Sequence, residues 1–268
     1  MIKTSKPRTS FRFSTVLAIS ALCGLLLVPA TARAQTAPVC AASPDLLRFD
    51  KPLIRTGQRL AAGLPITITA IGSSSTAGAF ASSSAAAYPA RLEVALKERF
   101  PAAIITVLNR GTNGEEAADM LQRLDLSLAE RPDLILWQVG TNAVLRDYNV
   151  DVSGMLIRRG VDRMKAYGAD VVLIDPQYAP KVLAKPDAHG MVDLIRATAK
   201  GENVDVFHRF DVMREWQETR QMPFESFLSP DLLHMNDWSY GCIAKLLAAS
   251  ISEAATRPFA SARAARGH

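Results

Sequence analysis

The segment LILWQV at residues 134–139 is almost wholly apolar, and GTN follows it directly at residues 140–142. An apolar run of this length without polar alternation is typical of a strand that is covered on both faces. Such strands occur in parallel sheets, because the crossover helices pack on both sides of the sheet. The segment therefore predicts a buried strand of a parallel sheet, and its polar ending predicts a loop at the carboxyl edge of that sheet.

Segments of strand and helix character alternate on both sides of this run. The predicted strands are residues 66–71, 103–108, 134–139, 171–174 and 204–207. The predicted helices are residues 88–100, residues 115–129, a helix capped by Asp151 or Ser153 that ends at Tyr167, residues 191–199, and residues 240–255 opened by Asp237 or Ser239. Five such units in about 190 residues predict an α/β fold with a doubly wound, five-stranded parallel sheet and helices on both faces. Ligands of such sheets bind beyond the carboxyl ends of the strands.

The net charge of the chain is concentrated at its beginning. The 268 residues include 31 basic and 26 acidic side chains, which gives a formal net charge of +5. Residues 1–34 hold five of the basic residues and none of the acidic ones, so 26 of each remain beyond residue 34. Because this remainder is neutral, the charge gives no reason to expect a nucleic acid as partner.

Residues 1–34 have the three parts of a secretory signal peptide. Basic residues between Lys3 and Arg12 precede an apolar run at residues 16–28, and cleavage after Ala34 fits the small-x-small pattern. The alternative is an uncleaved membrane anchor, but the run is shorter than the roughly 20 residues of a spanning helix. We therefore expect an exported protein, periplasmic or secreted, with no stable membrane insertion after signal cleavage.

The rest of the chain has no repeats, no low-complexity block and no long linker. Residues 35–64 fit no regular unit and are interpreted as an N-terminal arm. Residues 65–256 hold all the alternating units, so we expect them to form one domain. Residues 257–268 combine arginines with small residues, and we expect a disordered tail there.

Two cysteines, Cys40 and Cys242, remain beyond the leader. In an oxidising compartment such a pair is a candidate disulfide, and the alternative is two separate thiols. A bridge would close a loop of about 200 residues and add about 4 kcal/mol of stability in the chain-entropy model. Neither these cysteines nor the histidines have metal-ligand spacing, so we expect no metal and no other cofactor.

Four polar segments stand where the fold predicts a site. GSSSTAG (72–78), NRGTNG (109–114) and GTN (140–142) end the first three predicted strands, and DLLH (231–234) precedes the last helix. Because the carboxyl ends of parallel strands meet at one edge of the sheet, we expect the first three segments to lie close together.

These segments contain what acyl transfer requires. A serine hydroxyl becomes a nucleophile when a base, usually a histidine held by a carboxylate, takes its proton. Ser74 is the candidate nucleophile and His234 the candidate base, and Asp231 stands three residues before it, within one turn. The oxyanion of the intermediate needs donors, for which the backbone N–H groups of Ser74 and Gly114 and the side-chain amide of Asn142 are candidates.

Each segment alone has a simpler interpretation. A Ser-rich turn after a strand is usually only a turn, and Asn142 is of a type that often caps or turns the chain. The turn is not a Walker-type phosphate loop, because no lysine follows Gly78. It also lacks the G-x-S-x-G pattern, because Thr76 holds the final position. The interpretation as a catalytic site depends on the whole set in this order.

Other side chains near the strand ends have two interpretations each. Glu115 and Glu116 are either first-turn acids that complement a helix dipole or a polar wall near the site. Gln177, Tyr178 and Lys181 either line a substrate cleft or have ordinary loop roles. Trp137 is expected in the core. The sequence leaves open whether two further tryptophans belong to the core or to a cleft: Trp216 and Trp238.

The set of motifs resembles the SGNH (GDSL-type) hydrolase superfamily over residues 66–251. The nucleophile block Gly-Asp-Ser of that superfamily matches residues 72–74, and its Asn-x-Gly-x-x-Gly block matches residues 109–114. Its Gly-x-Asn block matches residues 140–142, and its Asp-x-x-His block matches residues 231–234.

The resemblance implies a three-layer, flavodoxin-like α/β/α sandwich. It also implies that Ser74, Asp231 and His234 are catalytic, with the oxyanion hole described above. The chain departs from the superfamily at two positions, since Ser73 replaces the usual Asp and Ala143 follows where Asp is common. Neither position carries the chemistry, so the departures leave the predicted catalysis in place.

Together these observations predict an exported carboxylic ester hydrolase that acts through a Ser-His-Asp triad and an acyl-enzyme. The expected partner is a small-molecule or polysaccharide ester, such as an acetylated polysaccharide, because export favours an envelope or environmental substrate. Two alternatives remain open. One is a carbohydrate O-acetyltransferase with the same triad, and the other is a non-catalytic envelope or carbohydrate-binding protein. The sequence predicts no oligomeric state.

Overall fold

The computed structural model describes residues 39–258, together with Met1 and residues 9 and 10. The predicted signal peptide lies almost wholly outside these residues, and so does most of the predicted tail. Within the part that the structure describes, no helix is long and apolar enough to cross a membrane. The description below concerns the compact unit that begins at Pro38.

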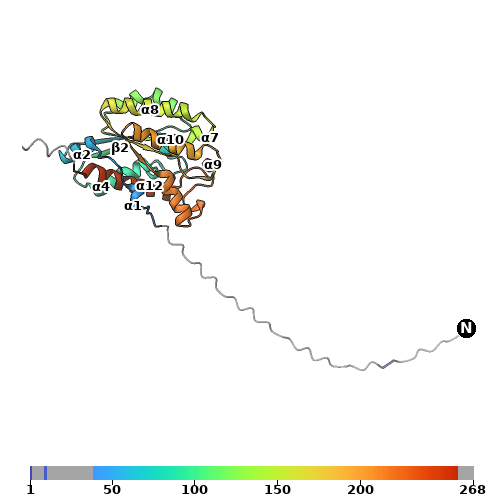
Figure 1. The fold of residues 1–268 in the computed structure, drawn as a ribbon. Coiled ribbons are helices and arrows are strands. Elements are labelled where there is room, and N and C mark those ends of the chain that lie inside the picture. The colour runs from blue at the N-terminus through green and yellow to red at the C-terminus, as the bar shows by residue number, and fades with distance from the viewer. Residues whose placement is uncertain (2–8, 11–38, 259–268) are drawn as a thin grey trace, which may run out of the picture. The chain divides into compact units, whose positions relative to one another are not determined.

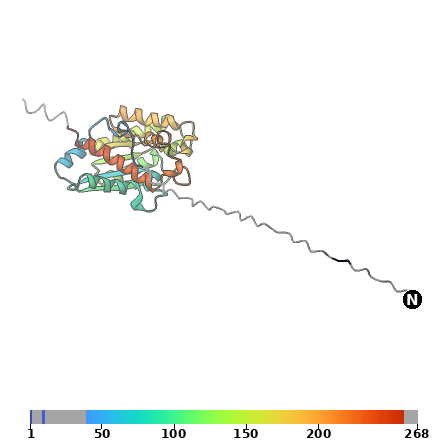
Figure 2. The ribbon, with the colours of Figure 1, turned by 90° about the horizontal axis from the view of Figure 1, so that it is seen from below.

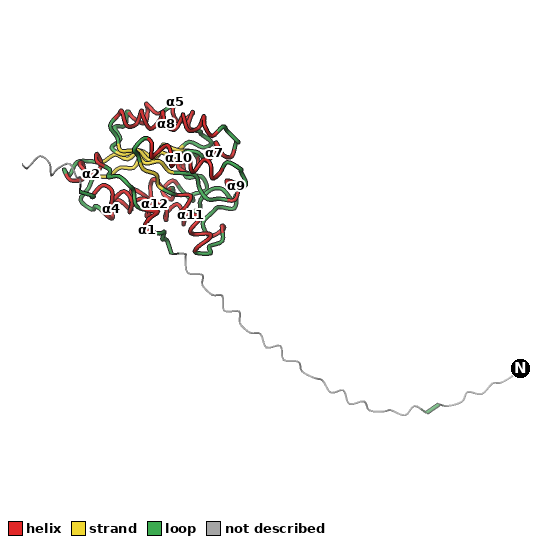
Figure 3. The backbone as a smooth tube through the Cα atoms, in the orientation of Figure 1, coloured by secondary structure: helices red, strands yellow, loops and turns green. Residues whose placement is uncertain are grey.

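Five parallel strands form a single central sheet with helices on both sides (Figures 1 and 3). The strands are β1 Ile66–Gly72, β2 Ile105–Gly111, β3 Leu134–Gln138, β4 Asp170–Ile174 and β5 Asp205–Phe207. Their order in the sheet is β2-β1-β3-β4-β5. This is the flavodoxin-like order, in which the chain reverses direction between β1 and β3 and ligands bind at that point. The predicted fold class, a three-layer α/β/α sandwich with a five-stranded parallel sheet, is confirmed.

Helices cover the sheet in two layers. The first layer contains α2 Ile54–Ala61, α4 Tyr88–Arg99 and α12 Asp237–Thr256, and the second contains α5 Ala117–Gln122, α8 Val150–Tyr167 and α10 Ala188–Gly201. In the first layer α4 and α12 lie side by side (Figure 2). Short helices occupy the connections: α1 Pro44–Leu47, α3 Ser74–Ala77, α6 Leu124–Leu128, α7 Thr141–Leu145, α9 Pro180–Leu183 and α11 Arg209–Arg214.

The core is centred on β3. Residues 134–137 are completely buried, as expected for a strand with helices on both faces. Trp137 packs so closely against α8 that a Cβ atom on Gly160 would lie 2.3 Å from its ring. Its indole nitrogen donates a hydrogen bond to Met120 Sδ over 3.1 Å. The prediction that Trp137 belongs to the core is confirmed, and glycine at residue 160 permits the close approach of the helix.

One predicted helix is divided in two. The prediction of a continuous helix over residues 115–129 is wrong, because α5 ends before Arg123 and α6 begins after it. The guanidinium of Arg123 turns back and donates to Glu115 Oε2 over 2.7 Å and to the carbonyl of Arg110 over 2.8 Å. These contacts hold Arg123 in a conformation that interrupts the helix.

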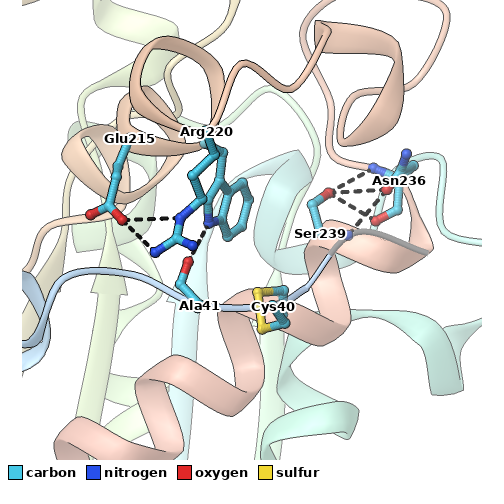
Figure 4. Close-up of a disulfide and its surroundings, with 8 residues drawn as sticks. Cys40, Ala41, Glu215, Arg220, Asn236 and Ser239 are labelled. Carbon is cyan, nitrogen blue, oxygen red and sulfur yellow. Dashed lines mark hydrogen bonds and ion pairs between the residues drawn. A yellow bond between two sulfur atoms is a disulfide. The ribbon is translucent and has the colours of Figure 1, made fainter. Parts of the chain in front are cut away.

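Both long helices begin earlier than predicted and are capped by asparagine. The side-chain oxygen of Asn149 accepts from the backbone N–H of Val152 at the start of α8. Asn236 opens α12 and exchanges two 3.1 Å hydrogen bonds with Ser239 in a capping box (Figure 4). The predicted caps are wrong, since they lie inside the helices: Asp151, Ser153, Asp237 and Ser239.

The expectation that residues 35–64 contain no regular element is wrong for its described part, since α1 and α2 lie there. The carboxylate of Asp170 caps α2 by accepting hydrogen bonds from the backbone N–H groups of Arg55 and Thr56, over 3.2 and 2.8 Å. The Thr56 hydroxyl donates to the same carboxylate over 2.7 Å. Because Asp170 belongs to β4, no local sequence pattern announces this helix.

Cys40 and Cys242 form a disulfide (Figure 4), so the expected pairing is confirmed. Their Cα atoms are 5.4 Å apart, within the range that a disulfide spans. Beside the bridge, the indole N–H of Trp216 donates to the carbonyl of Ala41 over 2.9 Å. The segment that contains Cys40 and Ala41 is thereby attached both to α12 and to the π-helical turn Glu215–Thr219 that follows α11.

Candidate active site

The predicted site residues lie at the carboxyl edge of the sheet. Gly72 and Gly111, the last residues of β1 and β2, are register partners. The chain therefore enters α3 at Ser74 beside the loop that contains Gly114. Asn142 lies in α7, which begins shortly after β3, the strand on the other side of β1. The switch between β1 and β3 thus brings three of the four predicted motifs together.

His234 makes a hydrogen bond with both other members of the predicted triad. Its Nε2 atom lies 2.8 Å from Ser74 Oγ, and its Nδ1 atom lies 2.6 Å from Asp231 Oδ2. The other carboxylate oxygen of Asp231 accepts from the backbone N–H groups of His234 and Leu233, over 3.0 and 3.1 Å. The arrangement has the geometry of a nucleophile, a base and an orienting acid.

The same contacts keep Asp231 ionised. Burial alone would raise the pKa of this carboxyl, but the hydrogen bonds from the His234 ring and from two backbone N–H groups hold the pKa below its ordinary value. A carboxylate that stays charged fixes the orientation of the imidazole and stabilises the imidazolium that forms when the base accepts a proton.

The carbonyl group of Glu115 connects Asn142 with the loop that contains Gly114. The side-chain amide of Asn142 donates to the carbonyl of Glu115, the residue after Gly114, over 2.9 Å. A primary amide has two N–H donors, so its second donor is available to an oxyanion. Gly114 has a φ of 79°, a left-handed conformation that glycine adopts without strain. The positions predicted for the oxyanion hole therefore adjoin each other.

Ser73 occupies the position where GDSL-type proteins have aspartate, and it is almost fully buried. Its backbone N–H and its hydroxyl both donate to Gln138 Oε1, over 2.9 and 3.0 Å. The Thr76 hydroxyl donates to the same oxygen over 3.3 Å. A neutral network thus fixes the turn around Ser74, which explains how the chain replaces the usual aspartate.

Arg209 is a buried residue of the site that the sequence analysis did not identify. Its guanidinium donates to Ser75 Oγ over 3.2 Å, to Gln177 Oε1 over 3.0 Å and to the carbonyl of Asp175 over 2.9 Å. Gln177 in turn donates to the carbonyl of Leu233, the residue before His234. Arg209 therefore connects the turn of the candidate nucleophile with the loop of the candidate base. Gln177 lies beneath the site and does not line a substrate cleft.

The charge of Arg209 is balanced by a buried carboxylate. Burial lowers the pKa of Arg209 to about 10, and Asp175 opposes that shift. Burial raises the pKa of Asp175 to about 6, while Arg196, the backbone N–H of Phe210 and Arg209 oppose the rise. The guanidinium stays protonated at neutral pH, so a positive charge lies permanently under the turn at Ser74.

Phe80 packs on the outer side of the triad. Its ring stacks on the His234 imidazole with a centroid distance of 5.2 Å and an interplanar angle of 22°. The side chain is 58% exposed, and its φ of 64° lies in the left-handed region that non-glycine residues avoid. An exposed aromatic ring held in an unfavourable backbone conformation beside a site indicates a function for that ring.

Glu116 and Arg146 lie on the opposite side, next to Gly114. They form an ion pair with an N–O distance of 3.1 Å. A Cβ atom on Gly114 would lie 3.4 Å from the guanidinium of Arg146. Burial raises the pKa of Glu116 to about 7, against the opposing charge of Arg146. Glu116 also lines a hollow of about 480 Å³, together with Gly140 and Ala143. Glu116 is also the N-cap of α5, where it forms a capping box with Asp119, so it both serves the start of this helix and lies in a wall near the site.

A family model described as the non-GDSL lipase-like family matches residues 39–257. The chain belongs to this family. Membership in the non-GDSL lipase-like family agrees with Ser73, which stands where the GDSL motif has its aspartate. A comparison with curated proteins finds no match.

Solved structures show the same fold. CEX, a two-domain esterase active on acetylated mannans, superposes with a TM-score of 0.65 at 19% identity over 79% of this chain. The chain spans 56% of the length of that esterase. Axe2 is an acetylxylan esterase from Geobacillus stearothermophilus, and the structure of a catalytic mutant of it superposes with a TM-score of 0.61 at 19% identity. The alignment covers 69% of this chain and 94% of the Axe2 chain. TesA superposes with a TM-score of 0.60 at 20% identity, and the alignment covers 70% of this chain and 99% of TesA.

The family match and these structures confirm the predicted resemblance to an SGNH-type hydrolase. CEX and Axe2 are carboxylic ester hydrolases, and this chain has the sheet and helix layers of their fold. At these identities the structural similarity concerns the fold. The roles of individual residues therefore follow from the site of this chain.

Proposed function

We propose that this protein is an exported serine esterase that removes small acyl groups from carbohydrate. The observation that carries the proposal is the continuous relay from Ser74 Oγ through the His234 ring to Asp231, with hydrogen bonds of 2.8 and 2.6 Å. A protein that only binds carbohydrate has no need for these three groups in hydrogen-bond contact.

The proposed reaction begins with attack on the ester. Ser74 Oγ attacks the carbonyl carbon while His234 Nε2 takes its proton, and the ionised Asp231 stabilises the imidazolium. The tetrahedral intermediate then collapses, and the imidazolium gives its proton to the departing alcohol oxygen. The acyl group remains on Ser74 until a water, deprotonated by His234, releases it as a carboxylic acid.

The negative charge of the intermediate falls on the former carbonyl oxygen. The backbone N–H groups of Ser74 and Gly114 and the second N–H of the Asn142 amide are the proposed donors. Their contribution depends on fixed geometry, which the left-handed Gly114 and the bond from Asn142 to the Glu115 carbonyl support.

Two observations support the proposed substrate and location. Similar folds belong to esterases described as active on acetylated mannans and as an acetylxylan esterase, which supports a small acyl group on a polysaccharide. The predicted leader over residues 1–34 and the Cys40–Cys242 disulfide support export to an oxidising compartment. Mass spectrometry of the exported protein tests the second point, because cleavage after Ala34 leaves Gln35 as the first residue.

Hydrolysis of p-nitrophenyl esters from acetate to octanoate tests the activity. We expect wild-type protein to hydrolyse the acetate best and Ser74→Ala to lose at least about a thousandfold in kcat. Ser83→Ala, the same change at a nearby exposed serine, serves as the matched control and should keep wild-type rates. Equal rates in wild type and Ser74→Ala would falsify the proposed mechanism. If an added acceptor sugar captured the acetyl group in preference to water, the protein would instead be a transferase.

A further inference from the structure

A hollow of about 680 Å³ lies beside the candidate base. Its lining includes Phe80, which stacks on the His234 imidazole. The lining also includes residues 228–230, just before Asp231, together with Glu225 and Trp238. The hollow therefore begins at the catalytic loop and extends away from it toward α12.

A second hollow, of about 390 Å³, continues from the first. The two share Asp237 and Trp238 as lining residues, so they adjoin at the start of α12. The second hollow follows α12 past Gly241 and Lys245 to the Cys40–Cys242 disulfide, with Arg91 and Glu98 of α4 on its other side. We call these two hollows together the Trp238 groove.

Trp238 occupies the middle of this groove and is supported from below. Its ring packs edge-on against Trp216, with a centroid distance of 5.0 Å and an angle of 66°. Trp216 is completely buried, and its N–H is bonded to the carbonyl of Ala41, the neighbour of Cys40 in the disulfide. Because Trp216 is buried and hydrogen-bonded beside the disulfide, Trp238 packs on a fixed support and forms a preorganised surface whose ordering costs little on binding.

The composition of the Trp238 groove fits a chain of sugar rings. Each sugar ring has a face of C–H groups that packs on an aromatic ring, for which Phe80 and Trp238 are placed. Its hydroxyls need hydrogen-bond partners, and the groove presents two exposed polar side chains, the carboxylate of Glu225 and the guanidinium of Arg91. A long aliphatic chain would bury these polar groups without partners, which is unfavourable.

The path of the proton in the proposed reaction indicates which part of the ester lies beside the groove. In the proposed mechanism His234 Nε2 delivers a proton to the departing alcohol, so the alcohol part of the ester lies on the His234 side of Ser74. The Trp238 groove begins on that side, at Phe80. We propose that the Trp238 groove binds the polysaccharide chain whose acyl group is removed at Ser74. This inference rests on the proposed function and adds the place where the polysaccharide lies.

Gly241 offers a way to block the groove without disturbing the fold. It lies within α12, and a Cβ atom there would meet no protein atom within 4 Å. Gly241→Gln therefore places a side chain in the second hollow and raises helix propensity at the same time. Gly190→Gln is the matched control, because Gly190 also lies in a long helix, α10, with nothing within 4 Å of its Cβ position. Trp238→Ala removes the aromatic surface as a second, independent variant.

The experiment compares acetylated xylooligosaccharides, from disaccharide to hexasaccharide, with p-nitrophenyl acetate. For wild type we expect kcat/KM to rise with the length of the oligosaccharide. In Gly241→Gln and Trp238→Ala, the value of kcat/KM for the hexasaccharide divided by that for p-nitrophenyl acetate should fall about tenfold, because KM for the hexasaccharide rises. In Gly190→Gln this ratio should not change. Unchanged ratios in both groove variants, with Ser74-dependent hydrolysis intact, would overturn the groove and leave the esterase standing.

Direct binding separates the two proposals if no hydrolysis is found. Deacetylated xylohexaose is titrated into wild type and into Gly241→Gln, and binding is followed by tryptophan fluorescence and calorimetry. Binding to wild type that weakens about tenfold in Gly241→Gln supports the groove whatever the activity. Equal binding by the two proteins, or none by wild type, refutes it.

Discussion

The two sides of Ser74 are held by different kinds of contact. On the His234 side, an ionised carboxylate orients the imidazole through a 2.6 Å hydrogen bond, and the fully buried Arg209 lies beneath. On the Gly114 side, the contacts are a glycine backbone and a single amide that is fixed by one carbonyl. Ion pairs also lie on this side, and in the one between Glu116 and Arg146 the arginine is 45% exposed.

This difference predicts how each side fails. The His234 side carries formal charges in a partly dry setting, so loss of one partner disturbs the proton transfer on which every turnover depends. The Gly114 side contributes several neutral donors to one oxyanion, so loss of one donor leaves the others in place. Changes on the His234 side should therefore cost the most activity.

The largest effect is expected for Asp231→Asn. The amide keeps an acceptor for the backbone N–H groups of Leu233 and His234, but it cannot orient and stabilise the imidazolium as a carboxylate does. We expect kcat for p-nitrophenyl acetate to fall about ten-thousandfold, with the melting temperature nearly unchanged. Asp193→Asn removes an exposed carboxylate and is the control. A loss of less than tenfold in Asp231→Asn would mean that the observed relay is not used.

On the other side of Ser74, Asn142→Ala should cost less. Removal of one oxyanion donor lowers kcat by about a hundred- to a thousandfold, while KM changes little because the donor acts mainly in the transition state. Asn149→Ala is the contrasting variant, since Asn149 caps α8 and should lower stability by about 1 kcal/mol without this loss of kcat. If Asn142→Ala raised KM and kept kcat, Asn142 would be a substrate ligand and not an oxyanion donor.

Arg209→Lys tests the connection beneath the His234 side. Lysine keeps the positive charge near Asp175 but cannot reach Ser75, Gln177 and the Asp175 carbonyl together, as the guanidinium does. We expect kcat to fall by about ten- to a hundredfold in a protein that circular dichroism shows to be folded, since small displacements of the catalytic groups are costly. Arg196→Lys also alters a contact to Asp175 but none to Ser75 or Gln177, so its kcat should stay near wild type. Equal kcat losses in the two variants would show that the contacts of Arg209 to Ser75 and Gln177 do not position the catalytic groups.

The sequence analysis predicted the features that short stretches of sequence determine. The apolar run at residues 134–139 contains its own evidence for a buried strand, and the polar ends of three strands share one edge in any sheet of this order. For the same reason Ser74, Gly114 and Asn142 could be grouped before any distance was known. Their roles stay predictions that kinetics tests.

The parts that the sequence analysis missed depend on contacts between distant residues. Arg209 lies 134 residues from Ser75, and Asp170 lies 114 residues from the helix start at Thr56 that it caps. One signal for Arg209 was present, because it follows β5 at the same carboxyl edge as the other site residues. Its burial was not foreseeable, because arginine is almost never fully buried unless it has partners, and those partners come from other strands.

The smallest effect should come from Glu116, on the Gly114 side, and it should appear as a dependence of stability on pH. Burial raises the pKa of Glu116 from 4.5 to about 7 in the folded protein, so the folded state binds this proton more tightly than the unfolded chain does. The resulting stabilisation is fully present below about pH 4.5 and is lost as the pH rises through about 7. The free energy of unfolding of wild type, relative to Glu116→Gln, should therefore decrease between about pH 5 and pH 8, by about 1 kcal/mol once the shift is discounted for solvent screening at this partly exposed site. Urea unfolding at several pH values measures this decrease.

Glu93→Gln is the control for this measurement. Hydrogen bonds from Lys97 and from the backbone N–H of Val107 outweigh burial and lower the pKa of Glu93, so the difference in unfolding free energy between wild type and Glu93→Gln should be flat over this range. A flat difference for Glu116→Gln as well would mean that the Arg146 charge keeps Glu116 ionised throughout, and that the Gly114 side, like the His234 side, is held by permanent charges.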